Sequence, residues 1–134
     1  MKKMTFLLLL CSSLLCAVLQ AQSKATPLET VQAQLDAYNK QDINAFCQVF
    51  AQDVLVYQSL GDTLPSLRGR EAVYDRYKAL FAKYPKNYST LTGRVIQGNF
   101  VIDHEYVTGR ENPTSIVAIY EVREGLILRC WFIR

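Results

Sequence analysis

The sequence has one histidine, one tryptophan and four cysteines in 134 residues. Cys11 and Cys16 fall in an apolar N-terminal stretch, which leaves Cys47 and Cys130 for the rest of the chain. No cysteines or histidines have the close spacing typical of a zinc or haem site. The sequence therefore predicts no metal site, and we expect no metal or organic cofactor.

Strong charge of either sign is also lacking. The 15 Lys and Arg residues against 12 Asp and Glu residues give a formal net charge of +3. This falls to +1 if the N-terminal stretch, with its two lysines, is removed. Nucleic-acid-binding domains normally carry a basic patch, so no nucleic acid partner is expected. Internal repeats and low-complexity segments are absent, and the length suits one domain with one core.

The long apolar run lies at the N-terminus, where two lysines precede a hydrophobic stretch that ends at Ala21. This pattern is typical of a signal peptide, so we predict a signal peptide over residues 1–21 and a mature domain over residues 22–134. Its interruption at residues 11–13 disfavours a transmembrane helix, which needs about 20 apolar residues. Both cysteines in it follow leucine, which disfavours lipidation. We expect an exported protein, periplasmic or secreted, without a stable membrane anchor.

An oxidising compartment would allow Cys47 and Cys130 to form a disulfide. The sequence leaves open whether the two residues meet. The favoured interpretation is that they are small buried residues on separate elements, because free cysteine is among the most buried residue types.

Three helices are predicted in the first half of the mature chain. Thr26, Pro27 and Glu29 form an N-cap, first-turn proline and capping box. Asp42 is expected to cap a short second helix, and a third is expected from about Arg70 to Pro85. A short strand over residues 54–58 is expected between the second and third helices.

The second half of the chain has the pattern of strands. They are predicted over residues 88–97, 100–108, 114–123 and 126–133, joined by turns, as an antiparallel meander. Helices followed by such a meander indicate an α+β domain whose curved sheet is covered on one face by helices. Residues 116–120 and 126–133 are apolar at consecutive positions, so both sheet faces are expected to be covered. Because the helices cover only one face, we expect a second copy, as a homodimer, on the other.

Four segments of the sequence carry a resemblance, namely Asn39-Lys40-Gln41-Asp42-Ile43, Phe50-Ala51-Gln52-Asp53-Val54, Leu67-Arg68-Gly69-Arg70-Glu71-Ala72, and Ile119-Tyr120-Glu121-Val122 followed by Trp131-Phe132. They resemble the nuclear transport factor 2-like superfamily, in particular its SnoaL-like and ketosteroid-isomerase-like branch. The resemblance implies a cone-shaped α+β fold, with three N-terminal helices packed on a curved antiparallel sheet. This scaffold hosts isomerases, cyclases, dehydratases and proteins without catalysis, so the fold does not give the function.

The resemblance also implies positions for an isomerase site. The family's aspartate base falls on Gln58, its donor tyrosine on Gln34 and its donor aspartate on Ala118. Only a supporting tyrosine is retained, as Tyr77. Because glutamine cannot take up the proton and alanine cannot donate one, ketosteroid isomerisation by the family's usual route is not expected.

His104 is the remaining candidate for a catalytic residue. Strand alternation puts it on one face with apolar neighbours and puts Asp103 and Glu105 on the other. We expect the apolar face to line the cavity, where burial would lower the pKa of His104 and keep it a neutral base. The slightly favoured alternative is a structural histidine that is hydrogen-bonded within the sheet.

A pocket with a few polar groups among aromatic residues suits a small apolar molecule. The favoured hypothesis is that the protein binds such a molecule. The alternatives are a cofactor-independent isomerase, cyclase or dehydratase that uses His104, and a dimerising module whose own side chains fill the pocket. The predicted ligand-binding residues are Gln34, Tyr38, Gln58, Tyr77, Phe100, Ile102, Tyr106 and Phe132.

Overall fold

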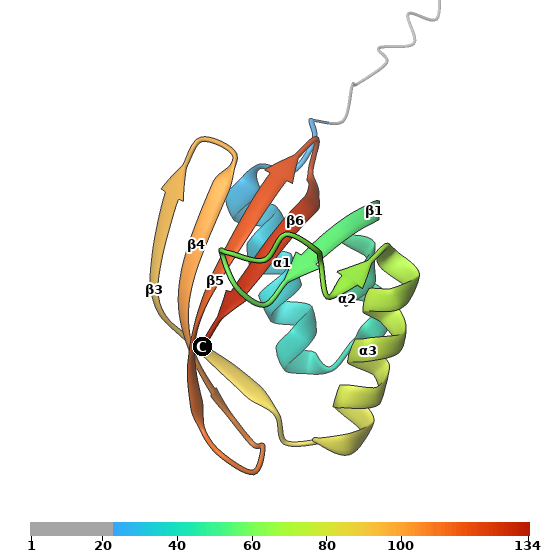
Figure 1. Cartoon of the computed structure of the whole chain (residues 1–134), viewed down its shortest axis with the longest axis vertical. Helices are drawn as coiled ribbons and strands as arrows, with labels where there is room; N and C mark the ends of the chain where they lie inside the picture. The colour runs from blue at the N-terminus through green and yellow to red at the C-terminus, as the bar shows by residue number, and fades with distance from the viewer. Residues whose placement is uncertain (1–22) are drawn as a thin grey trace, which may run out of the picture.

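The computed structural model describes residues 23–134. The predicted signal peptide, including Cys11 and Cys16, lies outside the described residues. Three helices pack on one side of a curved six-stranded sheet, which confirms the predicted α+β fold (Figure 1). Within the described part of the chain, no helix is long and apolar enough to cross a membrane.

The two N-terminal helices begin at the residues that the sequence indicates. The Thr26 side chain accepts a hydrogen bond from Glu29 N, and Glu29 Oε2 accepts one from Thr26 N, so the capping box is formed. Gln41 adopts a left-handed conformation and ends the first helix, and Asp42 caps the second. The helices are α1 (Pro27–Lys40), α2 (Ile43–Gln48) and α3 (Arg70–Lys83).

The sheet has the strand order β2-β1-β6-β5-β4-β3. Its last four strands form the predicted antiparallel meander over the predicted residues. The sheet as a whole is mixed rather than antiparallel as expected, because β1 pairs with β6 in parallel. These two strands are far apart in sequence, so no hairpin forces them to be antiparallel. The strands are β1 (Phe50–Tyr57), β2 (Leu67–Arg68), β3 (Tyr88–Gln97), β4 (Phe100–Thr108), β5 (Thr114–Arg123) and β6 (Leu126–Ile133).

Strand β1 differs from its prediction, since it begins at Phe50 rather than Val54. Phe50 is already paired with Ile127 of β6, and the register shifts before Leu55. The backbone oxygen of Phe50 also accepts a hydrogen bond from Arg70 Nε at 2.7 Å, which ties β1 to the start of α3. These contacts come from distant parts of the chain, so the local sequence pattern does not predict that β1 begins at Phe50.

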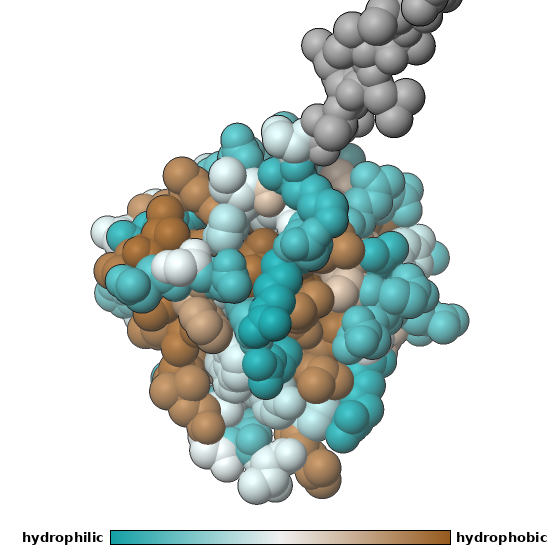
Figure 2. Space-filling view, turned by 90° about the horizontal axis from the view of Figure 1, so that it is seen from above, coloured by the Kyte–Doolittle hydropathy of each residue, from teal (hydrophilic) through white to brown (hydrophobic). Residues whose placement is uncertain are grey.

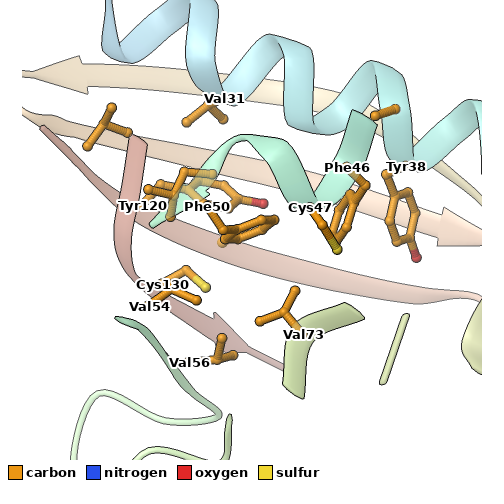
Figure 3. Close-up of a cluster of buried hydrophobic side chains, with 14 of the residues drawn as sticks. Val31, Tyr38, Phe46, Cys47, Phe50, Val54, Val56, Val73, Tyr120 and Cys130 are labelled. Atoms are coloured by element: carbon orange, nitrogen blue, oxygen red, sulfur yellow. The ribbon is translucent and has the colours of Figure 1, made fainter. Parts of the chain in front are cut away.

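The core lies between the helices and the inner face of the sheet. Asn39 joins α1 to β3, because its side chain both donates to and accepts from the Ser89 backbone. Phe46 packs against Phe50 with ring centroids 5.1 Å apart. Figure 3 shows this cluster, in which Cys47 and Cys130 lie apart with the Phe50 ring between them in the view. Both cysteines are buried and have free thiols.

The outer face of the sheet is covered by none of the three helices and is apolar. Tyr57 and Trp131 stack there with their ring centroids 5.5 Å apart. Val95, Ile102 and Ile119 form a row of cross-strand partners on the same face. Figure 2 shows hydrophobic surface gathered on the side of the molecule where β3 and β4 lie in Figure 1.

Candidate functional site

Strand β4 presents to the helices the face opposite to the one expected. Asp103 and Glu105 are buried, with exposed fractions of 0% and 8%, whereas His104 is exposed. The expectation that His104 faces the cavity is therefore wrong. Phe100 and Tyr106 share the outer face with His104 and are exposed, and Ile102 is half-buried there. None of these four residues lines the cavity.

The reversal has a physical cause in the neighbouring strand. Burial of a carboxylate is costly unless the group is paired and hydrogen-bonded. Asp103 is paired with Arg94 of β3, and Glu105 accepts a hydrogen bond from Ser89 Oγ at 2.5 Å. Apolar residues lie on both faces of this strand, Val101 and Val107 on the inner face and Phe100 and Ile102 on the outer face, so apolar character alone does not identify the inner face.

A partly enclosed cavity of about 70 Å³ lies between α1, α3 and the inner face of the sheet. Of the predicted ligand-binding residues, Gln34, Tyr38, Gln58, Tyr77 and Phe132 line it. The other polar-tipped groups in its wall are Glu105, Tyr120, Arg76, Arg110 and Arg134, and the remaining apolar groups are Leu35, Val56, Leu67, Leu80, Val107 and Ile116.

The floor of the cavity contains a buried polar chain. The Tyr120 hydroxyl lies 3.4 Å from Gln34 Oε1 and 3.5 Å from Glu105 Oε1. Burial raises the pKa of Glu105, an effect that the nearby Asp103 charge reinforces and the Ser89 hydrogen bond opposes. A protonated carboxyl group can donate a hydrogen bond. Protonated Glu105 would thus donate to Tyr120, which in turn would donate to Gln34.

Tyrosines from two helices form the wall opposite the sheet. Tyr38 and Tyr77 meet edge to face with their ring centroids 6.2 Å apart. Burial also raises the pKa of Tyr77, so its hydroxyl stays protonated near neutral pH.

Gln58 lies at the exposed rim, where its Nε2 is 3.4 Å from Ser66 Oγ. Ala118, where the resemblance places the family's donor aspartate, is fully buried.

Next to the cavity lies an open vestibule of about 420 Å³. Arg76, Leu80, Arg110 and Arg134 line both spaces, so the cavity and the vestibule are contiguous. A molecule larger than the cavity alone would extend into the vestibule.

Across residues 23–134, no three His, Cys, Asp or Glu residues lie close enough to hold a metal ion.

Glu105, Tyr120, Arg76 and Arg110 line the cavity but are not among the residues predicted from the sequence. One signal for Glu105 is available in the sequence, because Asp103 and Glu105 alternate in phase with Val101 and Val107, which are both buried. The position of Arg110 depends on partners 23 and 72 residues away, so no local pattern indicates it.

The helices, the curved sheet and the cavity between them define a nuclear transport factor 2-like protein. Residues 31–130 match the SnoaL-like domain family. The chain belongs to this family, as the resemblance of its sequence segments implies. No curated protein matches the sequence.

Several solved structures share this fold. An uncharacterised cystatin-fold protein from Novosphingobium aromaticivorans is 27% identical with a TM-score of 0.76, over 82% of this chain and 99% of that one. A candidate polyketide cyclase from Streptomyces antibioticus is 21% identical with a TM-score of 0.68, over 81% and 91%. A candidate ketosteroid isomerase from Kribbella flavida is 21% identical with a TM-score of 0.64, over 78% and 73%. Neighbours with such different descriptions give no specific activity.

Proposed function

We propose that this chain is an exported protein that binds a small, largely apolar molecule in the cavity of its cone. One observation carries the proposal: a cavity whose wall combines apolar side chains with polar tips, among them Gln34, Tyr38 and Tyr77. Small-molecule sites combine an apolar lining with polar groups that fix the orientation of the ligand. A cavity of about 70 Å³ admits only a short group, so the rest of the molecule would occupy the vestibule.

The test is a ligand titration followed by NMR of the backbone amides, with a matched pair of variants. Ile116 lines the cavity, and its neighbour Val117 points to the opposite face of β5. We expect short apolar amides and ketones to shift the resonances of cavity residues. Ile116→Phe, which fills the cavity, should abolish these shifts, and Val117→Phe should retain them. Equal responses in both variants would refute binding in the cavity.

Export rests on the N-terminal sequence pattern. Expression of the full chain in a bacterial host, followed by cell fractionation and intact-mass measurement, tests it. We expect a periplasmic or secreted product that begins at or within a few residues of Gln22. A full-length cytoplasmic product would contradict export.

A homodimer is the proposed assembly, with the outer face of the sheet as its interface. The stacked Tyr57 and Trp131 and the exposed Val95 support this assembly, since large apolar patches on a sheet normally mark an interface. A second copy would cover the outer face of the sheet, as the helices cover the inner face.

A second candidate function is cofactor-independent proton transfer, with Glu105 in the place expected for His104. The specific observation is a cavity-lining carboxyl group whose pKa is raised by burial and which lies beside the Tyr120 hydroxyl. A carboxyl group with a raised pKa is suited to general acid–base work near neutral pH.

Deuterium exchange at the carbon next to a ketone tests this second function. In D₂O, the wild-type protein should accelerate exchange into short ketones, and Glu105→Gln should not. Asp53→Asn, which changes an exposed carboxylate away from the cavity, serves as the control. If Glu105→Gln exchanges as fast as the wild type, Glu105 is not the base.

A further inference from the structure

Three arginines converge where the cavity opens into the vestibule. Arg76 comes from α3, Arg110 follows β4 and Arg134 follows β6, and all three line both spaces. Within residues 23–134, none of them forms an ion pair with an aspartate or glutamate. Arginines on protein surfaces often pair with neighbouring acids, so three unpaired guanidinium groups at one opening require an explanation.

Arg110 is held in place by neutral groups. Its Nε donates to Asn87 Oδ1 at 2.6 Å, and its Nη2 donates to the Tyr38 hydroxyl. These contacts fix the guanidinium group without neutralising its charge. They also leave Nη1 without a partner in the described part of the chain. Asn87 is itself buried, and its Nδ2 has no hydrogen-bond partner there.

The nearby acidic groups do not compensate the arginines. Glu111 lines the vestibule, but it lies 3.4 Å from Lys83 Nζ and accepts a hydrogen bond from the Tyr84 hydroxyl at 2.7 Å. Glu105 lies in the cavity wall, and its burial favours the neutral form of the carboxyl group. The opening therefore carries net positive charge, and apolar side chains such as Leu35 and Val107 line the cavity behind it.

We propose that the ligand is a small organic acid, with its carboxylate between Arg76, Arg110 and Arg134 and its apolar part in the cavity. The inference rests on the proposed function and adds to it the chemical class of the ligand. A planar guanidinium group matches a carboxylate with two parallel hydrogen bonds. The fixed position of Arg110 lowers the entropic cost of binding such a group.

The dimensions of the two spaces limit the shape of the acid. The cavity of about 70 Å³ is less than half of the roughly 150 Å³ that accommodates benzene in an engineered protein cavity. The part that enters it is therefore a short chain rather than a ring. The vestibule of about 420 Å³ has room for the carboxylate and for any larger remainder.

Isothermal titration of the mature protein with hexanoate, hexanamide and inorganic phosphate tests the inference. Hexanamide has nearly the same shape as hexanoate but no charge. We expect hexanoate to bind at least tenfold more tightly than hexanamide, and its affinity to fall as salt is raised, because exposed charges are screened. Equal affinities would overturn the inference and leave the proposed function intact.

The remaining outcomes are also decisive. If neither hexanoate nor hexanamide binds, the proposed function fails and the inference fails with it. If phosphate binds as tightly as hexanoate and displaces it, the arginines recognise a free oxyanion, and the organic acid is refuted.

Arginine variants test whether these three side chains cause the preference for hexanoate over hexanamide. Arg110→Gln should weaken hexanoate binding at least tenfold and leave hexanamide binding nearly unchanged. Arg76→Gln is the second variant, because Arg76 is exposed and its replacement should leave the fold intact. Arg68→Gln, at an exposed position on β2 outside both spaces, is the matched control and should behave as the wild type. Unchanged hexanoate affinity in both Arg110→Gln and Arg76→Gln would refute the arginine site.

Discussion

Arg94 and Asp103 face each other across β3 and β4 in a two-pronged ion pair, with Nε 2.6 Å from Oδ1 and Nη2 2.6 Å from Oδ2. The third nitrogen of the guanidinium group donates to Gln32 Oε1 of α1 at 2.7 Å. Asp103 is fully buried, so Arg94 supplies the charge that allows a carboxylate inside the sheet–helix interface. The pair fixes which face of β4 points inward, and it thereby places Glu105 in the cavity.

Replacement of Arg94 tests this dependence. Arg94→Met keeps most of the side-chain volume but leaves Asp103 buried without a partner, which costs about 3–5 kcal/mol of unfolding free energy. Urea unfolding followed by circular dichroism measures the loss. Arg68→Met, at an exposed position, should change stability by less than about 0.5 kcal/mol. Equal effects of the two substitutions would contradict a structural role for the pair.

Glu105 should make stability depend on pH in a defined direction. Burial raises its pKa in the folded protein above the value in the unfolded chain, so the folded state holds the proton more tightly. The contribution of Glu105 is fully present below the unfolded pKa of about 4.3 and is lost as pH rises through the folded pKa. Groups around it that also affect its charge are Asp103, Arg94, Ser89 and Tyr120.

The comparison of the wild type with Glu105→Gln isolates this contribution, because the other carboxylates are common to both proteins. Thermal unfolding between pH 4 and 8 should show the wild type losing stability relative to the variant as pH rises. Parallel pH profiles would mean that Glu105 has an ordinary pKa. The same measurements bear on catalysis, since proton transfer by Glu105 near neutral pH requires a raised pKa of its carboxyl group.

Gly109 fixes the backbone before Arg110. Its φ angle is +78°, and a Cβ there would lie 1.9 Å from the Lys86 backbone oxygen. Gly109→Ala should therefore cost well over the roughly 1–2 kcal/mol that a left-handed conformation costs an alanine. Gly98→Ala is the matched control, because Gly98 also has a positive φ but a Cβ there would have no atom within 4 Å. Calorimetric Tm values that fall equally would show that the close approach does not matter.

The sequence predicted regular elements well and side-chain direction poorly, for a physical reason. The capping box of Thr26 and Glu29 is contained in four residues, and the meander strands carry their own periodicity and turns. The inward direction of Glu105 depends on Ser89 in another strand, and the place of Arg110 depends on Tyr38 in α1. Such contacts form only when the fold assembles, so a local pattern does not report them.

The buried thiols yield a prediction about chemistry. Burial raises the pKa values of both Cys47 and Cys130, and only the thiolate form reacts readily. Thiol titration with a disulfide reagent, without reductant, should give almost no fast reaction in the folded protein of residues 22–134 and two thiols after denaturation. Finding no thiols after denaturation would show that the pair had formed a disulfide, against the separate positions in Figure 3.

The proposed dimer gives a prediction that separates the two faces of the sheet. Ile102 is half-buried on the outer face between Val95 and Ile119, so a charge there should oppose a second copy while leaving the helix-covered core untouched. Ile102→Glu should convert a dimer to a monomer in light scattering coupled to gel filtration. Ile96→Glu is the matched control, because Ile96 is 45% exposed and pairs with Val101, whose side chain points inward.

Ile96→Glu should remain a dimer, and both variants should keep the circular dichroism spectrum of the wild type. A wild type that runs as a monomer at micromolar concentration would refute the dimer. Dissociation in both variants would move the interface to the end of the sheet, where Ile96 lies. Retention of the dimer by Ile102→Glu would place the interface elsewhere and leave the apolar face of β4 without the partner proposed for it.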